Sequence, residues 1–177
     1  PQMKRATLEQ RRAVAKVKLG KDVFDEVEYL LHLLGVGTVM AASEAEAQAA
    51  HYTHHGLDAV ATEDMDALAF GANMMLRGLD CKGKATLIDR ALVLEGLGLN
   101  QLEFVDLCIL LGCDYTGTIP GIGCKRALAL MRKHRSIEGI LAAGYVQPEG
   151  FDYVAARQEF NTPTVALGEI VAQPRHL

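Results

Sequence analysis

Residues 43–66, SEAEAQAAHYTHHGLDAVATEDMD, contain two pairs of acidic residues, Glu44/Glu46 and Asp64/Asp66, each spaced i, i+2. No Lys or Arg occurs between Lys21 and Arg77, although further acidic residues lie in that gap. Carboxylates gathered without counter-ions repel one another, and burying them unpaired costs several kcal/mol each. Divalent cations relieve that repulsion, and Mg²⁺ is bound by a few carboxylates together with water and substrate phosphate. The stretch therefore predicts a Mg²⁺-dependent site for phosphate chemistry.

The pattern around these acids predicts strands that alternate with helices. The expected order is a strand at 38–41, a helix at 45–56, a strand at 57–61, a helix at 67–70 and a strand at 74–76. Such an order is typical of a parallel sheet with right-handed crossovers, in which ligands bind at the carboxyl ends of the strands. Both acid pairs follow a strand end, so we expect them at one rim of the sheet.

Two features of the 45–56 helix have more than one interpretation. Ser43 and Glu46 fit a capping box, which would explain Glu46 without a metal but leaves Glu44 unexplained. His51 and His55 have the i, i+4 spacing of zinc ligands, but no third Cys or His is suitably placed nearby. Cationic side chains are also common at the C-terminus of a helix, and this is the simpler explanation for the histidines.

The segment before residue 35 reads as helical. Residues 1–21 are rich in Lys and Arg, which fits either a nucleic-acid contact or an exposed helix at a frayed end. Apolar residues then recur at helical spacing between residues 22 and 34, which predicts one face in the core. The residues of this face are Val23, Val27, Leu30, Leu31 and Leu34.

A buried helix is expected after Asn100, which caps it together with Glu103 and which precedes a dense apolar face ending at Gly112. Asp114 follows this helix at once. It is either a solvated acid or a fifth carboxylate at the metal site. Residues 86–97 mix strand and helix cues and cannot be divided from the sequence.

Residues 118–126, TIPGIGCKR, combine two glycines with the start of a helix near Cys124. Glycine allows close approach of the backbone to another molecule, and a helix N-terminus favours an anion. The basic residues of this region are Lys125, Arg126, Arg132, Lys133 and Arg135. The segment fits a clamp on a DNA phosphate backbone that reads no bases, although a purely structural corner between helices remains the alternative. It is not a Walker P-loop, because Cys124 precedes Lys125.

Composition sets the remaining bounds. The 177 residues, 50% of them apolar, suit one domain of ordinary size, and the net charge of −4 favours no particular partner. The four cysteines form no CxxC pair, which is typical of free thiols in a reducing compartment. Neither a signal peptide nor a membrane span is visible. Pro1 begins inside a helical pattern, which favours a longer parent protein.

Four motifs together resemble the flap endonucleases, members of the structure-specific 5′ nuclease family. They are SEAEA at 43–47, ATEDMD at 61–66, NQLEFVDLCILLGCDY at 100–115 and GIGCKRAL at 121–128. The resemblance runs from about Arg11 to Val165 and implies a PIN-like α/β sheet flanked by helices. It implies an internal nuclease domain over residues 1–165, with a helix-two-turn-helix element at about 100–135, and a loose tail over 166–177.

The resemblance also implies roles for individual residues. The metal-site acids would be Glu44, Glu46, Asp64, Asp66 and Asp114, which would hold two Mg²⁺ ions about 4 Å apart. The carbonyls of Thr118, Ile119 and Ile122 would hold a K⁺ ion. Gly121, Gly123, Lys125 and Arg126 would contact the duplex backbone.

The chain departs from the family pattern in several places. The N-terminal region with two further metal-binding aspartates, the helical arch and the DNA-opening wedge have no counterpart in this sequence. The motif for a sliding clamp, which many relatives carry at the C-terminus, is likewise not found. Cys124 stands where relatives often have Pro.

The implied activity is hydrolysis of DNA phosphodiesters at a 5′ flap or a 5′ end, in replication and repair, in the nucleus of a eukaryote or the cytoplasm of another cell. The alternative is a catalytically deficient fragment that binds DNA junctions. An RNA-directed PIN-like nuclease, or a related exonuclease or repair-bubble endonuclease, is a third interpretation, which TEDMD and the NQLEFVDLCILLG helix disfavour.

Overall fold

The computed structural model describes residues 20–167, which group into two units. Residues 20–39 belong to the first unit, and Met40–Leu167 form the second. The basic helix expected over residues 1–21 lies almost wholly outside the described residues, as does most of the tail expected over 166–177. No helix within residues 20–167 is long and apolar enough to cross a membrane.

Helix α2 (Lys21–Leu33) is the helix of the first unit. The sequence predicts that one face of it is core, and this prediction is wrong for the described structure because α2 has no buried residue. Val27 is 49% exposed and Leu34 is 63% exposed. The spacing correctly predicts the helix but not a cover for its apolar face. Within residues 20–39, no second helix or strand is available to cover that face.

The second unit is built on a three-stranded sheet of β1 (Val60–Ala61), β2 (Met74–Arg77) and β3 (Thr86–Asp89), in the order β1-β2-β3. β1 pairs with β2 in parallel, and β2 pairs with β3 antiparallel. The α/β class is therefore confirmed, with a sheet that is mixed rather than wholly parallel. The strand expected at 38–41 does not form, because this stretch pairs with no strand among the described residues.

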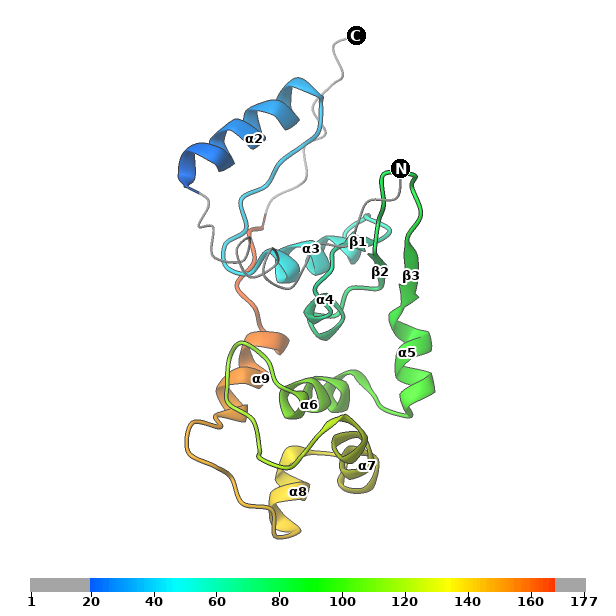
Figure 1. Cartoon of the computed structure of the whole chain (residues 1–177), viewed down its shortest axis with the longest axis vertical. Coiled ribbons are helices and arrows are strands. Elements are labelled where there is room, and N and C mark those ends of the chain that lie inside the picture. Colours follow the sequence, from blue (N-terminus) through cyan, green and yellow to red (C-terminus); the bar gives the residue numbers. More distant parts are fainter. Residues whose placement is uncertain (1–19, 168–177) are drawn as a thin grey trace, which may run out of the picture. The chain divides into compact units, whose positions relative to one another are not determined.

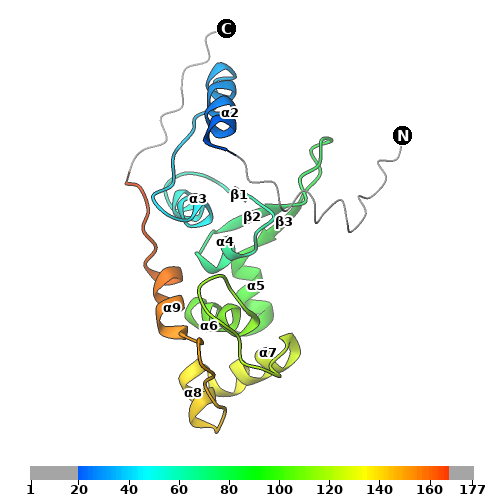
Figure 2. The ribbon, with the colours of Figure 1, turned by 60° about the vertical axis from the view of Figure 1, so that its left-hand side comes forward.

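Seven helices within residues 40–167 precede, separate and follow the strands along the chain (Figure 1). They are α3 (Ala45–Thr53), α4 (Asp66–Ala69), α5 (Arg90–Leu97), α6 (Gln101–Leu111), α7 (Cys124–His134), α8 (Ile137–Ala142) and α9 (Tyr153–Asn161). Helices α3 and α4 lie beside β1 and β2 in both ribbon views (Figures 1 and 2). The N-terminal ends of these two helices carry the acid pairs.

Asp89 explains why residues 86–97 could not be divided from the sequence. It is the last residue of β3, and its side chain also caps α5 by accepting bonds from the amides of Ala91 (2.8 Å) and Leu92 (3.3 Å). Because the strand passes into the helix without a loop, strand and helix cues overlap in the sequence.

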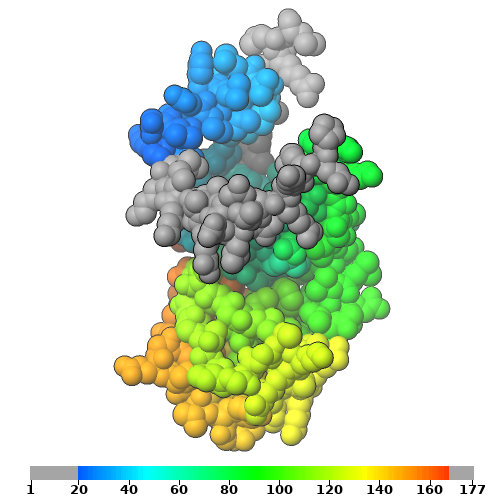
Figure 3. Space-filling model, viewed as in Figure 1, coloured from blue at the N-terminus to red at the C-terminus, as the bar shows by residue number. Residues whose placement is uncertain are grey.

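Helix α6 lies at the centre of the main apolar core. Its capping box is confirmed: the Asn100 side chain accepts from the Glu103 amide, and the Glu103 carboxylate accepts from the Asn100 amide. Val105 and Ile109 on this helix are fully buried. Helices α7 and α9 pack on α6, and α8 packs on α7, and Figure 3 shows the green, yellow and orange segments of this region adjoining one another.

An ion-pair network joins α6, α8 and α9. Arg157 of α9 donates two bonds to the carboxylate of Asp106 (2.8 and 2.9 Å) and two to that of Glu138 (2.8 and 3.0 Å). Asp106 is only 4% exposed and also accepts from the amide of Ile137 at 3.1 Å. The network therefore ties α8 and α9 to the buried helix α6.

Candidate metal and DNA-binding site

The two acid pairs lie on two loops of the second unit that are bonded to each other. Glu44 is the N-cap of α3 and Glu46 is in its first turn, whereas Asp64 lies between β1 and α4 and Asp66 is the first residue of α4. The hydroxyl of Thr62 donates to Glu46 Oε1 at 3.3 Å and accepts from the Asp64 amide at 3.1 Å. Thr62 therefore holds one pair beside the other.

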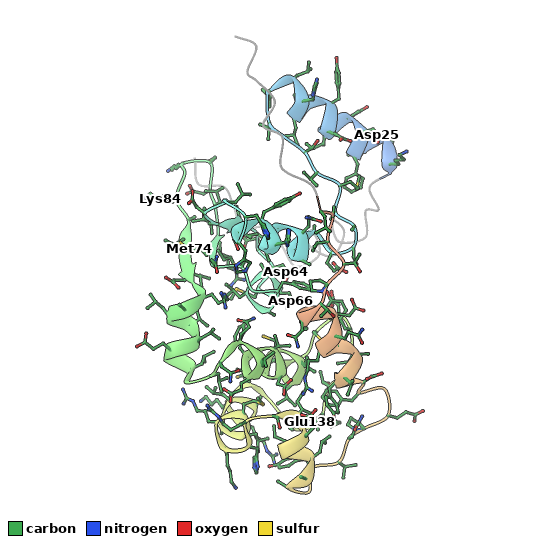
Figure 4. The ribbon with its side chains drawn as sticks, turned by 180° about the vertical axis from the view of Figure 1, so that it is seen from behind. Asp25, Asp64, Asp66, Met74, Lys84 and Glu138 are labelled. Atoms are coloured by element: carbon green, nitrogen blue, oxygen red, sulfur yellow. The ribbon has the colours of Figure 1, made fainter. Side chains whose placement is uncertain are left out.

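A hydrogen bond between Asp64 and Asp66 explains why these two acids lie on the same turn. The Asp66 amide donates to Asp64 Oδ1 at 3.0 Å, which closes the turn into α4 and sets both carboxyl groups on it (Figure 4). On the other loop, the predicted capping box is wrong: α3 begins at Ala45, and Glu44 rather than Ser43 is its N-cap. Capping therefore does not account for Glu46, whose carboxylate contacts Thr62 instead.

The electrostatics of Asp66 show that all five predicted acids come together. Burial and, in decreasing order, the charges of Asp64, Asp114, Glu46 and Glu44 together raise the pKa of Asp66 to about 6. None of these carboxylates forms an ion pair with Lys, Arg or His within residues 20–167. The structure thus brings together acids from three separate loops, with no protein counter-ion among the described residues.

Asp114 reaches this group from a short turn after α6. The turn is closed by an isolated bridge between Cys113 and Thr116, and Gly112 begins it with a φ of 108° that favours glycine. Burial, together with the charge of nearby Asp66, raises the pKa of the Cys108 thiol to about 12. Cys108 therefore stays a neutral, mostly apolar neighbour of the acids.

Sequence reasoning overlooked the aromatic layer under the acids. Phe70, Tyr115 and Phe160 form a mutual cluster with ring centroids 5.0 to 6.4 Å apart. Phe70 follows Asp66 by one helical turn, and Tyr115 follows Asp114 directly. Burial and the charges of Glu44, Asp66 and Asp114 raise the pKa of Tyr115. The three residues are far apart in the chain, so no local spacing would have revealed them.

Glu63 is the acid in this stretch that serves a different purpose. Its carboxylate accepts from the Gly78 amide at 2.7 Å and lies 3.5 Å from Arg77 Nε. It therefore fastens the 62–66 loop to the end of β2.

The donor set of the five acids fits Mg²⁺. It consists of carboxylate oxygens, which are the hard ligands this ion prefers, and their mutual repulsion is relieved by positive charge. Within residues 20–167, no three His, Cys, Asp or Glu side chains come close enough to enclose one ion. Mg²⁺ does not need such a cage, because it commonly takes one or two protein carboxylates and completes its shell with water and phosphate oxygens.

The histidines at the end of α3 show no such arrangement. The rings of His51 and His55 stack at 4.1 Å, and His55 Nδ1 lies 2.9 Å from the carbonyl oxygen of His51. No third ligand joins them within the described part of the chain. They occupy the last turn of the helix and the residues just after it, as the simpler interpretation predicts.

The glycine turn before α7 has the geometry expected for close backbone approach. Gly121 has a φ of 78°, and Gly123 is the N-cap of α7 with no side chain bonded over the helix start. The side chains of Ile119 and Ile122 are buried, which holds the turn against the core. The amide of Ile122 donates to the carbonyl of Ile119 at 3.2 Å, while Thr118 is exposed.

The basic residues of this region divide into two groups. Arg132 donates to the carbonyls of Leu97 and Gly96, and Arg135 donates to that of Gly98, so both cap the C-terminal end of α5. Lys125 and Lys133 instead are exposed and have no polar partner among residues 20–167.

Arg126 has a structural contact as well as a charge. Its guanidinium donates to the Gly121 carbonyl at 3.2 Å and to the Tyr145 hydroxyl at 3.3 Å, and its Cζ lies 5.4 Å from the Tyr145 ring centroid. It ties the glycine turn to the loop after α8, a contact that the sequence pattern did not reveal.

Comparisons with known proteins agree with this geometry. Residues 35–114 match the family model described as the XPG I-region. The flap endonuclease 1 of Aedes aegypti is 46% identical over 164 residues, 88% of this chain and 43% of that protein. That of Cryptosporidium muris is 41% identical over 172 residues, 88% of this chain and 36% of that protein. The chain therefore spans well under half the length of these relatives.

Solved structures share the fold. The flap endonuclease-1 of Methanococcus jannaschii is 34% identical, with a TM-score of 0.73 over 93% of this chain and 53% of that one. Human GEN1 in complex with Holliday junction DNA is 26% identical, with a TM-score of 0.70 over 96% of this chain and 48% of that one. The catalytic core of Rad2 with DNA substrate is 20% identical at a TM-score of 0.79, a likeness of fold alone. The predicted resemblance to the flap endonucleases is thereby confirmed: residues 35–114 match the XPG I-region, and 88% of the chain is similar to flap endonuclease 1 at 41% to 46% identity.

Proposed function

We propose that this chain provides the metal-binding and duplex-binding core of a Mg²⁺-dependent nuclease that hydrolyses DNA phosphodiesters at 5′ flaps and 5′ ends. The observation that carries the proposal is the proximity of five carboxylates from three segments of the chain, whose charges add to burial in raising the pKa of Asp66 to about 6. The named activity of the relatives supports the choice of substrate.

The acids divide by the loop that carries them. Asp64 and Asp66 on the β1–α4 loop would hold one ion, with Asp114 assisting, and Glu44 would help to hold another. Glu46, bonded to Thr62, lies where it can serve both groups. When bound, paired Mg²⁺ ions activate water for in-line attack and stabilise the leaving oxygen. The aromatic layer of Phe70, Tyr115 and Phe160 supports the two loops that carry Asp66 and Asp114.

The turn before α7 is the proposed grip on duplex DNA. The free amides at the start of α7 favour a phosphate, and Gly121 and Gly123 let the backbone come close to it. Lys125 adds an uncompensated positive charge next to these amides. Arg126 contributes mainly by fixing the turn through Gly121 and Tyr145. Such contacts position a duplex without reading its sequence, which suits an enzyme that recognises structure.

The further partners follow from the same proposal. The carbonyls of Thr118, Ile119 and Ile122 would take a K⁺ ion at this turn; the structure of a GEN-1 relative is named for binding potassium. A sliding clamp would bind a segment outside this chain. In a eukaryote the place of action would be the nucleus.

The test of the proposal is cleavage of a 5′-flap DNA in Mg²⁺ by the chain and by its Asp66→Ala variant. The variant should lose about 100-fold or more in rate, because it loses a carboxylate that would hold the Mg²⁺ ion stabilising the transition state, while its affinity for the flap stays nearly unchanged. Asp58→Ala, an exposed acid before β1, is the matched control and should cleave normally. Equal loss of cleavage and binding in Asp66→Ala would contradict a metal role.

The second candidate is a DNA-junction binder without activity. It is favoured by the share of the relatives that the chain spans, 36% to 43%, and by the lack of three clustered ligands within residues 20–167. It predicts Mg²⁺-independent duplex binding and no cleavage by the unaltered chain. Cleavage by this chain would exclude it. Cleavage that appears only after an N-terminal family segment is added would show that the chain holds an incomplete active site.

A further inference from the structure

Gln48 is a buried polar residue on the helix that carries the first acid pair. It lies on α3, one turn after Glu44 and two residues after Glu46, and its residue is 4% exposed. Its side-chain Nε2 donates to the carbonyl of Ala166 at 3.2 Å, and its Oε1 accepts from the amide of Ala166 at 2.6 Å. One side chain thus satisfies both backbone groups of a residue far away in the sequence.

This pairing has strict chemical requirements. A side-chain amide offers a donor and an acceptor at once, so it can replace a neighbouring strand in satisfying one residue's N–H and C=O. An apolar side chain offers neither, and a carboxylate would place an oxygen against the Ala166 carbonyl. Because a buried amide is costly unless it is bonded, the contact also fixes the Gln48 side chain in place.

The segment that Gln48 holds runs from α9 toward α3 in both ribbon views (Figures 1 and 2). We call residues 160–166 the strap. At its first residue, the Phe160 ring lies 5.0 Å from that of Phe70 and 5.1 Å from that of Tyr115. Phe70 is the C-cap of α4, the helix that begins with Asp66, and Tyr115 follows Asp114. The strap is therefore packed against the supports of Asp66 and Asp114 at one end and against α3 at the other.

The strap counteracts the electrostatic repulsion between the carboxylates of the site. The carboxylates repel one another, and a side-chain hydrogen bond of 3.3 Å from Thr62 to Glu46 links the two acid pairs. A second link between α3 and the aromatic layer would limit how far the first turn of α3 can move from Asp66 and Asp114.

We propose that Gln48 is a positioning residue for the metal site: by binding the strap, it holds α3, and with it Glu44 and Glu46, at the distance from Asp66 and Asp114 that metal binding requires. The inference rests on the proposed function, since it assigns a role toward the same acids. Residues that orient metal ligands without touching the metal typically contribute 10- to 100-fold to metal affinity.

The experiment compares the chain with its Gln48→Met variant, which keeps the side chain long and removes both bonds. Amide hydrogen exchange at Ala166, followed by NMR, reports whether the strap is held. Binding of Mn²⁺ as a probe for Mg²⁺, measured by electron paramagnetic resonance well below the unfolding temperature, reports the site in the folded protein. A general loss of stability in the variant would not change the Mn²⁺ affinity measured at that temperature.

The matched control is Gln147→Met. The Gln147 side chain also donates to a backbone carbonyl, that of Phe151 at 2.8 Å, but both residues lie in the loop before α9. It should leave Mn²⁺ affinity and Ala166 protection as they are in the unaltered chain.

The expected result is faster exchange at Ala166 and about tenfold weaker Mn²⁺ binding in Gln48→Met alone. If the unaltered chain binds Mn²⁺ but Gln48→Met shows unchanged amide protection at Ala166 or unchanged Mn²⁺ affinity, the inference is wrong and the proposed function is unaffected. Failure of the unaltered chain to bind Mn²⁺ would instead contradict the proposed function, and the inference would fall with it.

Discussion

Asp66 holds its proton more tightly than an ordinary aspartate, because it is partly buried among four other carboxylates. Its pKa rises from 3.8 to about 6 on folding, so between these values the folded chain binds a proton that the unfolded chain has released. Stability therefore falls as pH rises through this window.

This sign gives a prediction for the metal-free chain. The difference in free energy of unfolding between Asp66→Asn and the unaltered chain should grow in favour of the variant from pH 4 to pH 6 and level off above about 6. Urea unfolding at several pH values measures it. Parallel pH profiles for the two proteins would show that the carboxylates do not crowd Asp66.

At the residue scale, the sequence indicated which acids are candidate metal ligands but not which contacts hold those acids in place. Spacing and the lack of nearby Lys or Arg singled out Glu44, Glu46, Asp64 and Asp66. Thr62, Gln48 and Phe160 were missed, because their contacts join residues 16 to 118 positions apart or depend on aromatic packing that no local pattern encodes.

The elements that frame the site are held by interactions of very different strength. Arg157 joins three helices through Asp106, which is 4% exposed, whereas Arg77 pairs with Glu63 at 3.5 Å on the surface. Removing one partner of a buried pair leaves an uncompensated charge, but an exposed pair contributes little.

We therefore expect Arg157→Met to lower the free energy of unfolding by about 3–5 kcal/mol. Arg77→Met, the control, should cost less than about 1 kcal/mol. Chemical denaturation of both variants compares them. Similar small losses would mean that the Arg157 network is not what holds α8 and α9 to α6.

A separate prediction concerns the turn before α7. Lys125→Ala should weaken binding to duplex DNA and reduce the slope of log affinity against log salt by about 0.9, because one phosphate contact is lost. Fluorescence anisotropy at several salt concentrations measures both quantities. Lys82→Ala, at the exposed β2–β3 turn, should change neither. An unchanged slope in Lys125→Ala would contradict the phosphate clamp.

Element boundaries show where local sequence decides structure. The Asn100–Glu103 capping box fixed the start of α6 because both bonds lie within four residues. The predictions of a strand at 38–41 and of a buried face on α2 were wrong, because each structure needs a packing partner that the local sequence cannot supply. The boundary between β3 and α5 was hidden for a different reason, since Asp89 belongs to both elements.

At the scale of the second unit, the account makes one central claim: acids from three loops form one metal site. The claim depends on long-range packing, to which Thr62, the aromatic layer and the strap contribute. The sequence predicted that the acids converge from the order of strands and helices, although the sheet that brings them together is mixed.

Iron-directed cleavage of the polypeptide tests this claim most directly. Fe²⁺ in place of Mg²⁺, with ascorbate and peroxide, cuts the backbone close to where the ion is bound, and mass spectrometry locates the cuts. We predict cuts near residues 44–46, 64–66 and 113–115 together, all suppressed by excess Mg²⁺ and by Asp66→Asn. Cuts at only one of these loops, or cuts elsewhere that Mg²⁺ does not suppress, would contradict a shared site.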